Sequence, residues 1–422
     1  MKLLHRLGAW TLVALLASGA AADALAQTRL RVFAGGANQR PDLTRQLFAE
    51  YVKTRPGLVI ETESGGATSD LQRQYLSTIL NARDPSIDIY LIDIVNPAQY
   101  FGAGWLEPLN AYLGPPAQVM QNFLPAYSAS NVIDGQIAAM PAFADAMFMY
   151  YRRDLLEKHG IPLPRTWDEL GAAAQKIRAA EGDPNLQGLS IQGGPVEGAV
   201  CTFLMPYWSQ GRELNDAAGR LTLDRAAATR GLQQWLKLVD QGAIKRNVAE
   251  VKTPDTVNEF KAGQVVFGLG WTFAWDRFAS DADSKVKGKV GVMPVPAMAG
   301  GQSVTCIGGW QWAVSAFSRH KAEAARLVQF MASARASRFL AVHGSLLPTT
   351  LDVYTDPDVL KAVPWFQDAA AVVAGGKSRP ASRDYGQVSD AIRTTTSAVL
   401  ARSKTPEQGV ATIGSRLARV MR

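Results

Sequence analysis

From residue 30 onward, apolar positions follow two alternating patterns. Continuous or alternating apolar runs at residues 30–33, 59–63 and 87–92 are typical of strands. The segments between them, residues 41–54 and 70–80, repeat apolar positions at helical spacing. Because strands and helices alternate along the chain, the pattern predicts a mostly parallel sheet covered by helices.

The same alternation continues to the C-terminus, with strands predicted at residues 265–269 and 291–295. Two helix starts carry a capping-box pattern, Ser69 with Gln72 and Thr166 with Glu169. No proline- or glycine-rich linker divides the 422 residues. Since single cores stop growing at about 250–300 residues, we predict two lobes between which the chain crosses more than once.

The N-terminus has the pattern of a secretory signal peptide. Lys2 and Arg6 precede an apolar run at residues 7–17, and a small-x-small site ends at Ala26. The run is shorter than the roughly 20 residues that span a bilayer. We therefore expect residues 1–26 to be removed after Ala26 and the mature protein to be exported to a periplasm.

Charge and cysteine content narrow the function classes. The formal net charge is +7, but the cations are scattered, and no basic stripe of the kind that binds nucleic acid is present. Cys201 and Cys306 could pair in an oxidising compartment. Two separate buried thiols are the interpretation that we favour, because cysteine is among the most buried residue types. Their spacing does not suggest a metal site, and we expect no metal and no cofactor.

Catalytic motifs are missing from the chain. The histidines are dispersed, and neither a nucleophile elbow nor a phosphate-binding glycine loop occurs. Glycine pairs, such as Gly308-Gly309, lack dinucleotide-binding spacing and are interpreted as tight turns. We predict a protein without catalytic residues, not an enzyme.

Two acids occupy positions suited to a polyhydroxyl ligand. Asp93 follows the strand at residues 87–92, and ligands of open α/β sheets bind outside the carboxyl ends of strands. Asp145 ends an apolar run that begins at residue 140 and could cross between lobes. An ionised carboxylate accepts two hydroxyl hydrogen bonds at once. The ordinary alternative is that each acid caps a following helix or turn.

Aromatic residues complete this candidate site. Trp271 follows the strand at residues 265–269, Trp310 follows a glycine pair, and Trp275 lies one turn beyond Trp271. Sugar rings present apolar C–H faces that stack on aromatic planes, so we expect these side chains at a cleft. Burial in the core is the ordinary alternative for any tryptophan.

These residues belong to a longer series of short motifs. In these motifs and in the order in which they occur, the chain resembles family 1 of the extracellular solute-binding proteins of ABC importers, and within it the trehalose/maltose-binding type. The resemblance rests on residues 88–93, 103–109, 142–145, 150–156, 164–170, 260–263 and 308–310, and on Arg379-Pro380 with Tyr385.

The resemblance implies an α/β, periplasmic-binding-protein-like fold, with two α/β lobes, a central ligand cleft and multiple hinge crossings. We place the N-lobe at residues 27–138 and 296–343 and the C-lobe at residues 139–295 and 344–422. In the family, acids at Asp93 and Asp145 bind hydroxyls, Trp271 and Trp310 stack on sugar rings, and Arg379 closes over the ligand. The expected ligand-binding set also contains Gly309, Phe143, Asn38, Gln39, Thr68, Ser69 and Trp275.

Two departures from the family pattern concern the ligand. Asn38 and Gln39 stand in a loop where relatives often carry an acid, and Phe143 replaces a tyrosine or tryptophan. The ligand can therefore differ from trehalose and maltose.

The predicted function is that of a monomeric receptor that closes on a small oligosaccharide, such as a disaccharide, and delivers it to a membrane permease. Alternatives are the same fold binding a non-sugar solute, a receptor for a chemotaxis or sensor protein, and a glycoside hydrolase that uses Asp93 and Asp145.

Overall fold

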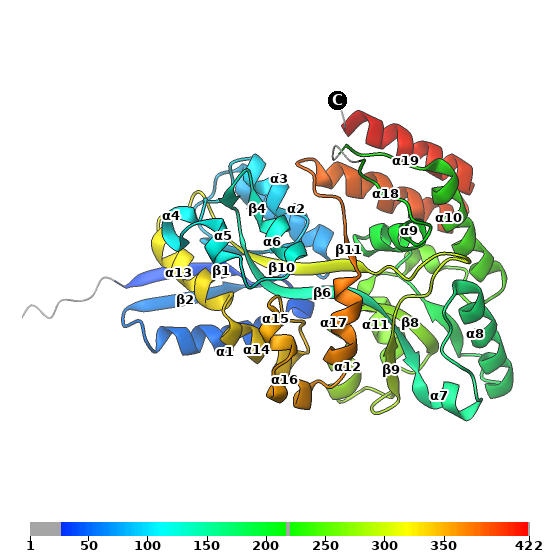
Figure 1. The fold of residues 1–422 in the computed structure, drawn as a ribbon. Coiled ribbons are helices and arrows are strands. Elements are labelled where there is room, and N and C mark those ends of the chain that lie inside the picture. The colour runs from blue at the N-terminus through cyan, green and yellow to red at the C-terminus, as the bar shows by residue number, and fades with distance from the viewer. Residues whose placement is uncertain (1–26, 217–219, 421–422) are drawn as a thin grey trace, which may run out of the picture.

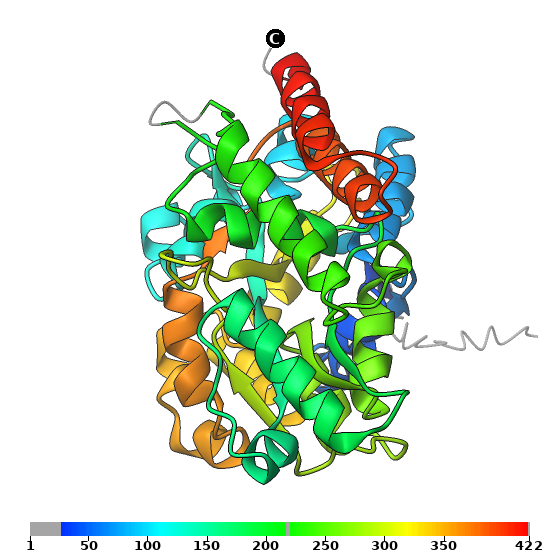
Figure 2. The ribbon, with the colours of Figure 1, turned by 90° about the vertical axis from the view of Figure 1, so that its right-hand side faces the viewer.

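The computed structural model describes residues 27–216 and 220–420, so the predicted signal peptide at residues 1–26 lies outside the described residues. Strands form a nine-stranded mixed sheet, with helices packed around it (Figures 1 and 2). The strand order is β2-β1-β3-β10-β6-β8-β7, with β11 paired to β10 and β9 paired to β6. Among the described residues, no helix is both long enough and apolar enough to span a bilayer.

The first part of the chain forms the parallel unit that the apolar pattern predicts. Strand β1 (Thr28–Phe33) pairs in parallel with β2 (Leu58–Glu63) and with β3 (Ile89–Asp93). Helices α1 (Pro41–Val52) and α2 (Ser69–Asn81) are the connections between these strands. All five residues of β3 are buried, which explains why this strand is continuously apolar up to its terminal aspartate.

One strand joins the two halves of the sheet. Strand β6 (Met140–Arg152) pairs through its first part with β10 (Cys306–Val314). Its second part pairs with β8 (Val265–Trp271) and β9 (Val290–Met293). Figure 1 shows β6 and β10 running side by side along the middle of the molecule. These strands connect the two halves of the sheet.

The centre of the sheet is antiparallel, so the prediction of a mostly parallel sheet is wrong there. Strand β10 lies between β3 and β6 and is antiparallel to both, and β6 is antiparallel to β8. Parallel pairing resumes where β7 (Gln187–Ser190) joins β8 and where β11 (Lys377–Ser378) joins β10. Apolar periodicity reports that a segment is a strand but carries no information on its direction.

The C-terminal part of the chain contacts both halves. Helices α18 (Tyr385–Leu400) and α19 (Pro406–Val420) pack on α10 (Arg225–Asp240), and α18 also packs on α9 (Gly198–Ser209). Helices α15 (Leu351–Tyr354) and α16 (Pro357–Ala362) instead contact α14 (Ala334–Gly344). The lobe boundary that we predict at residue 344 therefore falls before helices that pack on an N-lobe helix, and the exact division stays a prediction.

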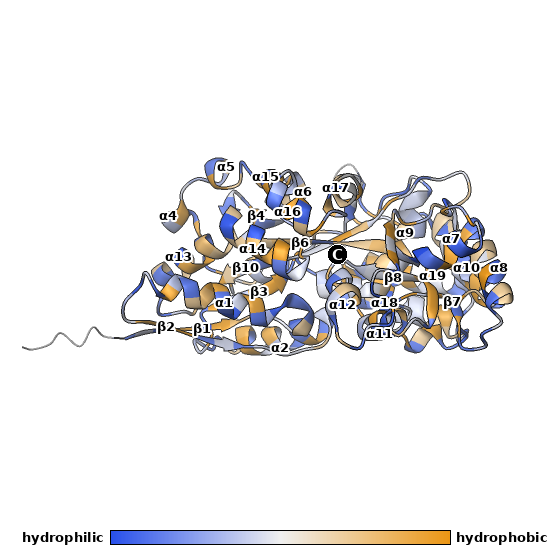
Figure 3. Cartoon of the chain, turned by 90° about the horizontal axis from the view of Figure 1, so that it is seen from below, coloured by the Kyte–Doolittle hydropathy of each residue, from blue (hydrophilic) through white to orange (hydrophobic). Residues whose placement is uncertain are grey.

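The remaining elements surround the main sheet, and most helices carry both hydrophobic and hydrophilic residues (Figure 3). These remaining elements are η1 (Ala37–Gln39), α3 (Pro97–Gly102), α4 (Asn110–Leu113), α5 (Pro116–Val119), α6 (Pro125–Asn131), β4 (Val132–Ile133), β5 (Gln136–Ile137), α7 (Arg153–Lys158), α8 (Trp167–Glu181), η2 (Val248–Glu250), α11 (Thr253–Lys261), α12 (Ala274–Ser280), α13 (Lys321–Met331) and α17 (Phe366–Ala374). Among them, β4 and β5 pair as a separate two-stranded sheet.

The two cysteines form a disulfide, which corrects the favoured interpretation of separate buried thiols. Cys201 lies on α9 and Cys306 is the first residue of β10, with 5.6 Å between their Cα atoms. Both side chains are fully buried, as we expected of cysteine. The bond ties a helix of the second half to a strand that runs through the centre of the sheet.

One of the two predicted N-caps is present, without the reciprocal half of its capping box, because the Glu169 side chain accepts from the Arg165 amide. The Thr166 hydroxyl accepts a hydrogen bond from the Glu169 amide at the start of α8, as predicted. At α2 the N-cap is Thr68, whose side chain makes no capping hydrogen bond, so the predicted Ser69 cap is wrong. The Ser69 hydroxyl instead donates to the Asp93 carboxylate, because β3 brings that acceptor to the start of the helix.

Candidate ligand-binding site

A pocket lies where the two halves of the sheet meet. It has about 510 Å³ of empty space, a figure that includes the part open to solvent. Ten of the twelve residues predicted to bind ligand line it. They are Asn38, Gln39, Thr68, Ser69, Asp93, Asp145, Trp271, Gly309, Trp310 and Arg379.

The register of β10 explains why residues far apart in the sequence meet here. Trp310 stands opposite Asp93 on β3, and Gly308 stands opposite Asp145 on β6. Neighbouring strands lie about 5 Å apart, so these pairings bring the two acids onto either side of β10. Asp145 lies inside the long strand β6 and does not end an apolar run, in contrast to the sequence interpretation.

Gly308 and Gly309 belong to this strand and not to the tight turn that we predicted. A Cβ atom on Gly308 would lie 2.6 Å from the ring of Trp271, closer than side chains tolerate. Gly309 has φ +134°, and a Cβ there would lie 2.7 Å from the ring of Tyr127. The glycine pair therefore makes room for two aromatic rings that pack against the strand.

Both carboxylate oxygens of Asp93 accept hydrogen bonds from other side chains of the protein. Arg379 Nη2 lies 2.7 Å from Oδ1 and Nη1 lies 3.3 Å from Oδ2, a two-pronged ion pair. The Ser69 hydroxyl donates to Oδ2 at 2.6 Å. The Arg379 side chain is only 1% exposed, and its guanidinium carbon lies 5.9 Å from the centre of the Trp271 ring. Arg379 is therefore committed to partners within the chain.

Glu197, which the sequence analysis missed, is the second acceptor of Arg379. Its Oε1 lies 2.8 Å from Arg379 Nη1 and also accepts from the Tyr385 hydroxyl. Its Oε2 accepts from Ser389 at 2.6 Å and from Arg73 at 3.2 Å. No motif marks this residue, since a lone glutamate in a glycine- and proline-rich stretch is typical of a loop.

Two neighbouring arginines offset the cost of burying the negative charge of Glu197. Burial by itself raises the pKa of the Glu197 carboxyl, but the charges of Arg379 and Arg73 outweigh burial and hold that pKa below its ordinary value. The carboxylate is therefore ionised at neutral pH.

Asp145 has no cation beside it. Its Oδ1 accepts from the backbone amides of Ala146 at 2.9 Å and Thr272 at 2.8 Å, and from the Thr272 hydroxyl. Burial raises the pKa of Asp145 to about 7 in spite of these hydrogen bonds, and the negative charge of Asp93 acts in the same direction. Among the described residues, nothing donates to Oδ2, so one oxygen of this carboxylate is available to a ligand.

The aromatic lining consists of Trp271, Trp310 and Phe273, of which Phe273 was not predicted. Trp271 and Trp310 are 9% and 7% exposed, so each presents only part of its ring to the pocket.

Two predicted residues are not brought to the pocket. Phe143 is buried in the core, and Trp275 lines a different cavity, where its ring centre lies 5.3 Å from that of Trp365. Trp271 is the last residue of β8, and the chain turns at Thr272 and Phe273 before α12 begins, so Trp271 and Trp275 belong to different elements.

Further lining residues lack a signal in the sequence: Ala67, Gly198 and Thr253. Two lining residues also contain a buried polar atom without a hydrogen-bond partner, Thr68 Oγ1 and Arg379 Nε. Such atoms are costly unless something else satisfies them, as a ligand can. Within the described chain, no group of histidine, cysteine and acidic side chains could hold a metal ion.

Comparisons with known proteins agree with this architecture. Residues 37–337 match the family described as bacterial extracellular solute-binding protein. The chain belongs to this family. It is 34% identical over 361 residues to a probable ABC transporter-binding protein of Deinococcus radiodurans, covering 83% of this chain and 84% of that protein.

Solved structures show the same fold. A maltose-bound T. maritima MalE3 superposes with a TM-score of 0.87 at 31% identity, covering 93% of this chain and 99% of the other. The GacH receptor of Streptomyces glaucescens superposes with a TM-score of 0.82 at 24% identity, covering 93% and 98%. The predicted family and the two-lobed binding-protein fold are thereby confirmed.

Proposed function

We propose that this protein is the substrate-binding component of an ABC sugar importer and that its ligand is a small neutral sugar. The observation that carries the proposal is the unpaired Oδ2 of Asp145 in a pocket that Trp271 and Trp310 also line. A carboxylate oxygen accepts sugar hydroxyls, and indole rings offer planes for the apolar faces of the sugar.

The charges of the pocket favour a neutral ligand over an anion. Its ionisable lining residues are Asp93, Asp145, Glu197 and Arg379, so acids outnumber the single cation. The charge of that cation is already offset by the carboxylates of Asp93 and Glu197, which leaves little net attraction for a phosphate or carboxylate group of a ligand. A sugar acid or sugar phosphate would meet net negative charge here.

A disaccharide such as maltose or trehalose is the first ligand to test. Support comes from the T. maritima protein, which is 31% identical and was solved with maltose. The amide side chains of Asn38 and Gln39 line the pocket where relatives often carry an acid, so another α-glucoside or small oligosaccharide is equally compatible with it.

We further propose that the protein works as a monomer in the periplasm, after removal of residues 1–26. Sugar would bridge both lobes, and strands β6 and β10 would flex as the lobes close on it. The closed form would then dock on the membrane permease. Closure follows only if the sugar binds the closed form more tightly than the open one.

Glycoside hydrolysis by Asp93 and Asp145 is disfavoured by the surroundings of Asp93. A nucleophile or general base needs a free carboxylate oxygen, whereas both oxygens of Asp93 are engaged by Arg379 and Ser69.

Calorimetry with a panel of maltose, trehalose, mannitol, ribitol and tagatose tests the proposal. At least one sugar should bind, and Trp271→Ala should weaken its binding about tenfold on typical stacking energies. Trp275→Ala is the matched control, because this tryptophan lies outside the pocket and its loss should leave affinity unchanged. If no sugar binds, or if the two variants weaken binding equally, the assignment of this pocket is wrong.

A further inference from the structure

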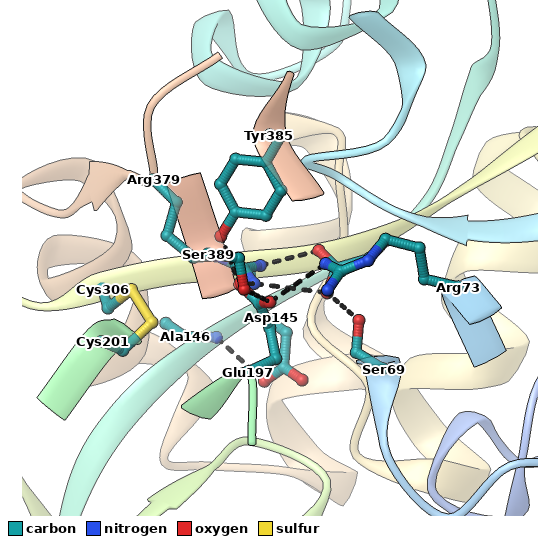
Figure 4. A network of polar contacts seen from close by, with 12 residues as sticks. Ser69, Arg73, Asp145, Ala146, Glu197, Cys201, Cys306, Arg379, Tyr385 and Ser389 are labelled. Carbon is teal, nitrogen blue, oxygen red and sulfur yellow. Dashed lines mark hydrogen bonds and ion pairs between the residues drawn. A yellow bond between two sulfur atoms is a disulfide. The ribbon is translucent and has the colours of Figure 1, made fainter. Parts of the chain in front are cut away.

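The polar network around Glu197 joins parts of the chain that the proposed division assigns to different lobes. Ser69 and Arg73 lie on α2 and Asp93 ends β3, all in the N-lobe. Glu197 directly precedes α9, while Tyr385 and Ser389 lie on α18, which packs on α9. Figure 4 shows these groups converging from three directions on the carboxylate and guanidinium at the centre.

Three contacts of this network cross between the lobes. Arg73 donates to Glu197 Oε2 at 3.2 Å, the Glu197 amide donates to Asp70 Oδ1 at 3.3 Å, and Arg379 links Glu197 to Asp93. Every donor and acceptor in these contacts belongs to the chain itself. Their formation therefore requires closure of the lobes but not a bound sugar.

We propose that Glu197 is a positioning residue that couples lobe closure to the ligand site, as the acceptor shared by Arg73 and by the arginine that orients Asp93. Arg73, Glu197 and Arg379 are nearly fully buried, with side chains 10%, 5% and 1% exposed. Loss of one member of a buried ion network leaves the remaining charge uncompensated. In an open form the groups of the two lobes separate and water solvates each of them. Removal of the Glu197 charge therefore penalises the closed form selectively.

The disulfide supports this role by holding the segment that carries Glu197. Cys201 is four residues beyond Glu197 on α9, and Cys306 is two residues before Gly308, which lines the pocket. The bond thus keeps the start of α9 beside β10, next to the pocket. The position of Glu197 therefore depends on strand β10 as well as on the lobe to which Glu197 belongs.

A change in closure also changes apparent sugar affinity. If sugar binds the closed form, the apparent dissociation constant rises by the factor by which the closed population falls. This consequence rests on the proposed function, whereas the effect on closure does not involve sugar.

The test measures the distance between the lobes without any sugar. Spin labels at Lys53→Cys and Lys176→Cys, both exposed and on opposite lobes, report this distance by pulsed electron resonance. Glu197→Gln should shift the distribution to distances that differ from those of the parent protein, and it should weaken binding of maltose, or of whichever panel sugar binds, at least tenfold. Circular dichroism melting confirms that each variant is folded.

Two further variants distinguish a role of Glu197 in lobe closure from a role in stability alone. Arg73→Gln removes one of the three contacts across the lobes and leaves Glu197 bound to Arg379, Tyr385 and Ser389, so it should shift the distances in the same direction by a smaller amount. Asp390→Asn removes an acid on α18 that pairs with Arg416 and Arg393 inside one lobe, and it should change neither distance nor affinity.

An unchanged distance distribution in folded Glu197→Gln overturns the proposal. If that variant does not fold, Arg73→Gln decides alone, and a folded Arg73→Gln with parental distances overturns it equally. If no sugar binds to the parent protein, the proposed function fails, but the distances without sugar still decide the role of Glu197.

Discussion

The pocket holds two buried aspartates that are stabilised in different ways. Asp93 lies against Arg379 and Ser69, with a partner on each oxygen. Asp145 is held by two backbone amides and the Thr272 hydroxyl, all on Oδ1, and its pKa is raised by burial to about 7. One carboxylate is neutralised by a cation, whereas the other keeps an oxygen open.

This difference separates two tasks that sequence reasoning assigned to both acids. A carboxylate paired with arginine stabilises the arrangement of the protein but has little capacity left for ligand hydroxyls. A buried carboxylate with an open oxygen is costly to the folded protein and useful to a ligand that brings donors. We therefore expect Asp93 to matter most for stability and closure, and Asp145 for ligand contact.

Arg379→Met should have the largest effect on stability. It leaves Asp93 and Glu197 buried without their shared cation, which typically costs about 3–5 kcal/mol of unfolding free energy. Urea denaturation measures this change. Arg416→Met is the matched control, because its ion pair with Asp390 is partly exposed and should cost less than about 1 kcal/mol. If both variants lost the same unfolding free energy, burial would not make the Asp93–Arg379 pair more stabilising than the partly exposed pair.

The pH dependence of stability should have opposite signs for Asp145 and Glu197, both of which line the pocket. Because the pKa of Asp145 is raised in the folded state, its contribution is present below pH 3.8 and is lost as pH rises to about 7. Relative to Asp145→Asn, the parent protein should lose up to about 4 kcal/mol over this range.

Glu197 supplies the contrast. Its pKa is lowered in the folded state, so its contribution is present above its ordinary value of 4.5 and is lost as pH falls below that. Urea titrations of Asp145→Asn and Glu197→Gln from about pH 2 to about pH 8, each against the parent protein, check both signs. A flat difference curve for Asp145→Asn would contradict the raised pKa.

Asp145→Ala should weaken sugar binding by about 1.5–3 kcal/mol, the usual size of a hydrogen bond to a charged group. Asp145→Asn keeps the shape and one acceptor and should lose less. Calorimetry with the sugar that binds measures both variants. Affinity of the parent protein should rise between pH 6 and 8, since hydroxyl donors favour the ionised carboxylate. Unchanged affinity in Asp145→Ala would remove Asp145 from the ligand site.

The smallest effect is expected at an ion pair outside the pocket lining. Arg40, in the loop before α1, pairs with Asp276 of α12 at 2.5 Å, and both side chains are more exposed than the Glu197 network. Asp276→Asn should therefore change stability by less than about 1 kcal/mol, and less still at high salt. A loss as large as that of Arg379→Met would show that solvent exposure does not weaken this pair.

Much of the fold was predictable because local patterns carry it. The strands that end at Asp93 and Trp271 are apolar runs, and their terminal residues line the pocket as predicted. Strand β10 was not predicted, since its glycine pair interrupts the apolar pattern. The need for those glycines arises from Trp271 and Tyr127, which the fold brings in from elsewhere.

The sequence by itself determined the family, five of the sheet strands and ten residues of the pocket, because apolar periodicity and ordered motifs are local properties of the chain. Only the tertiary structure decided which partners the charged groups take. The Cys201–Cys306 bond, the place of Glu197 and the different surroundings of Asp93 and Asp145 depend on contacts between segments up to 286 residues apart. Such contacts are set by strand register and helix packing, and spacing along the chain does not encode them.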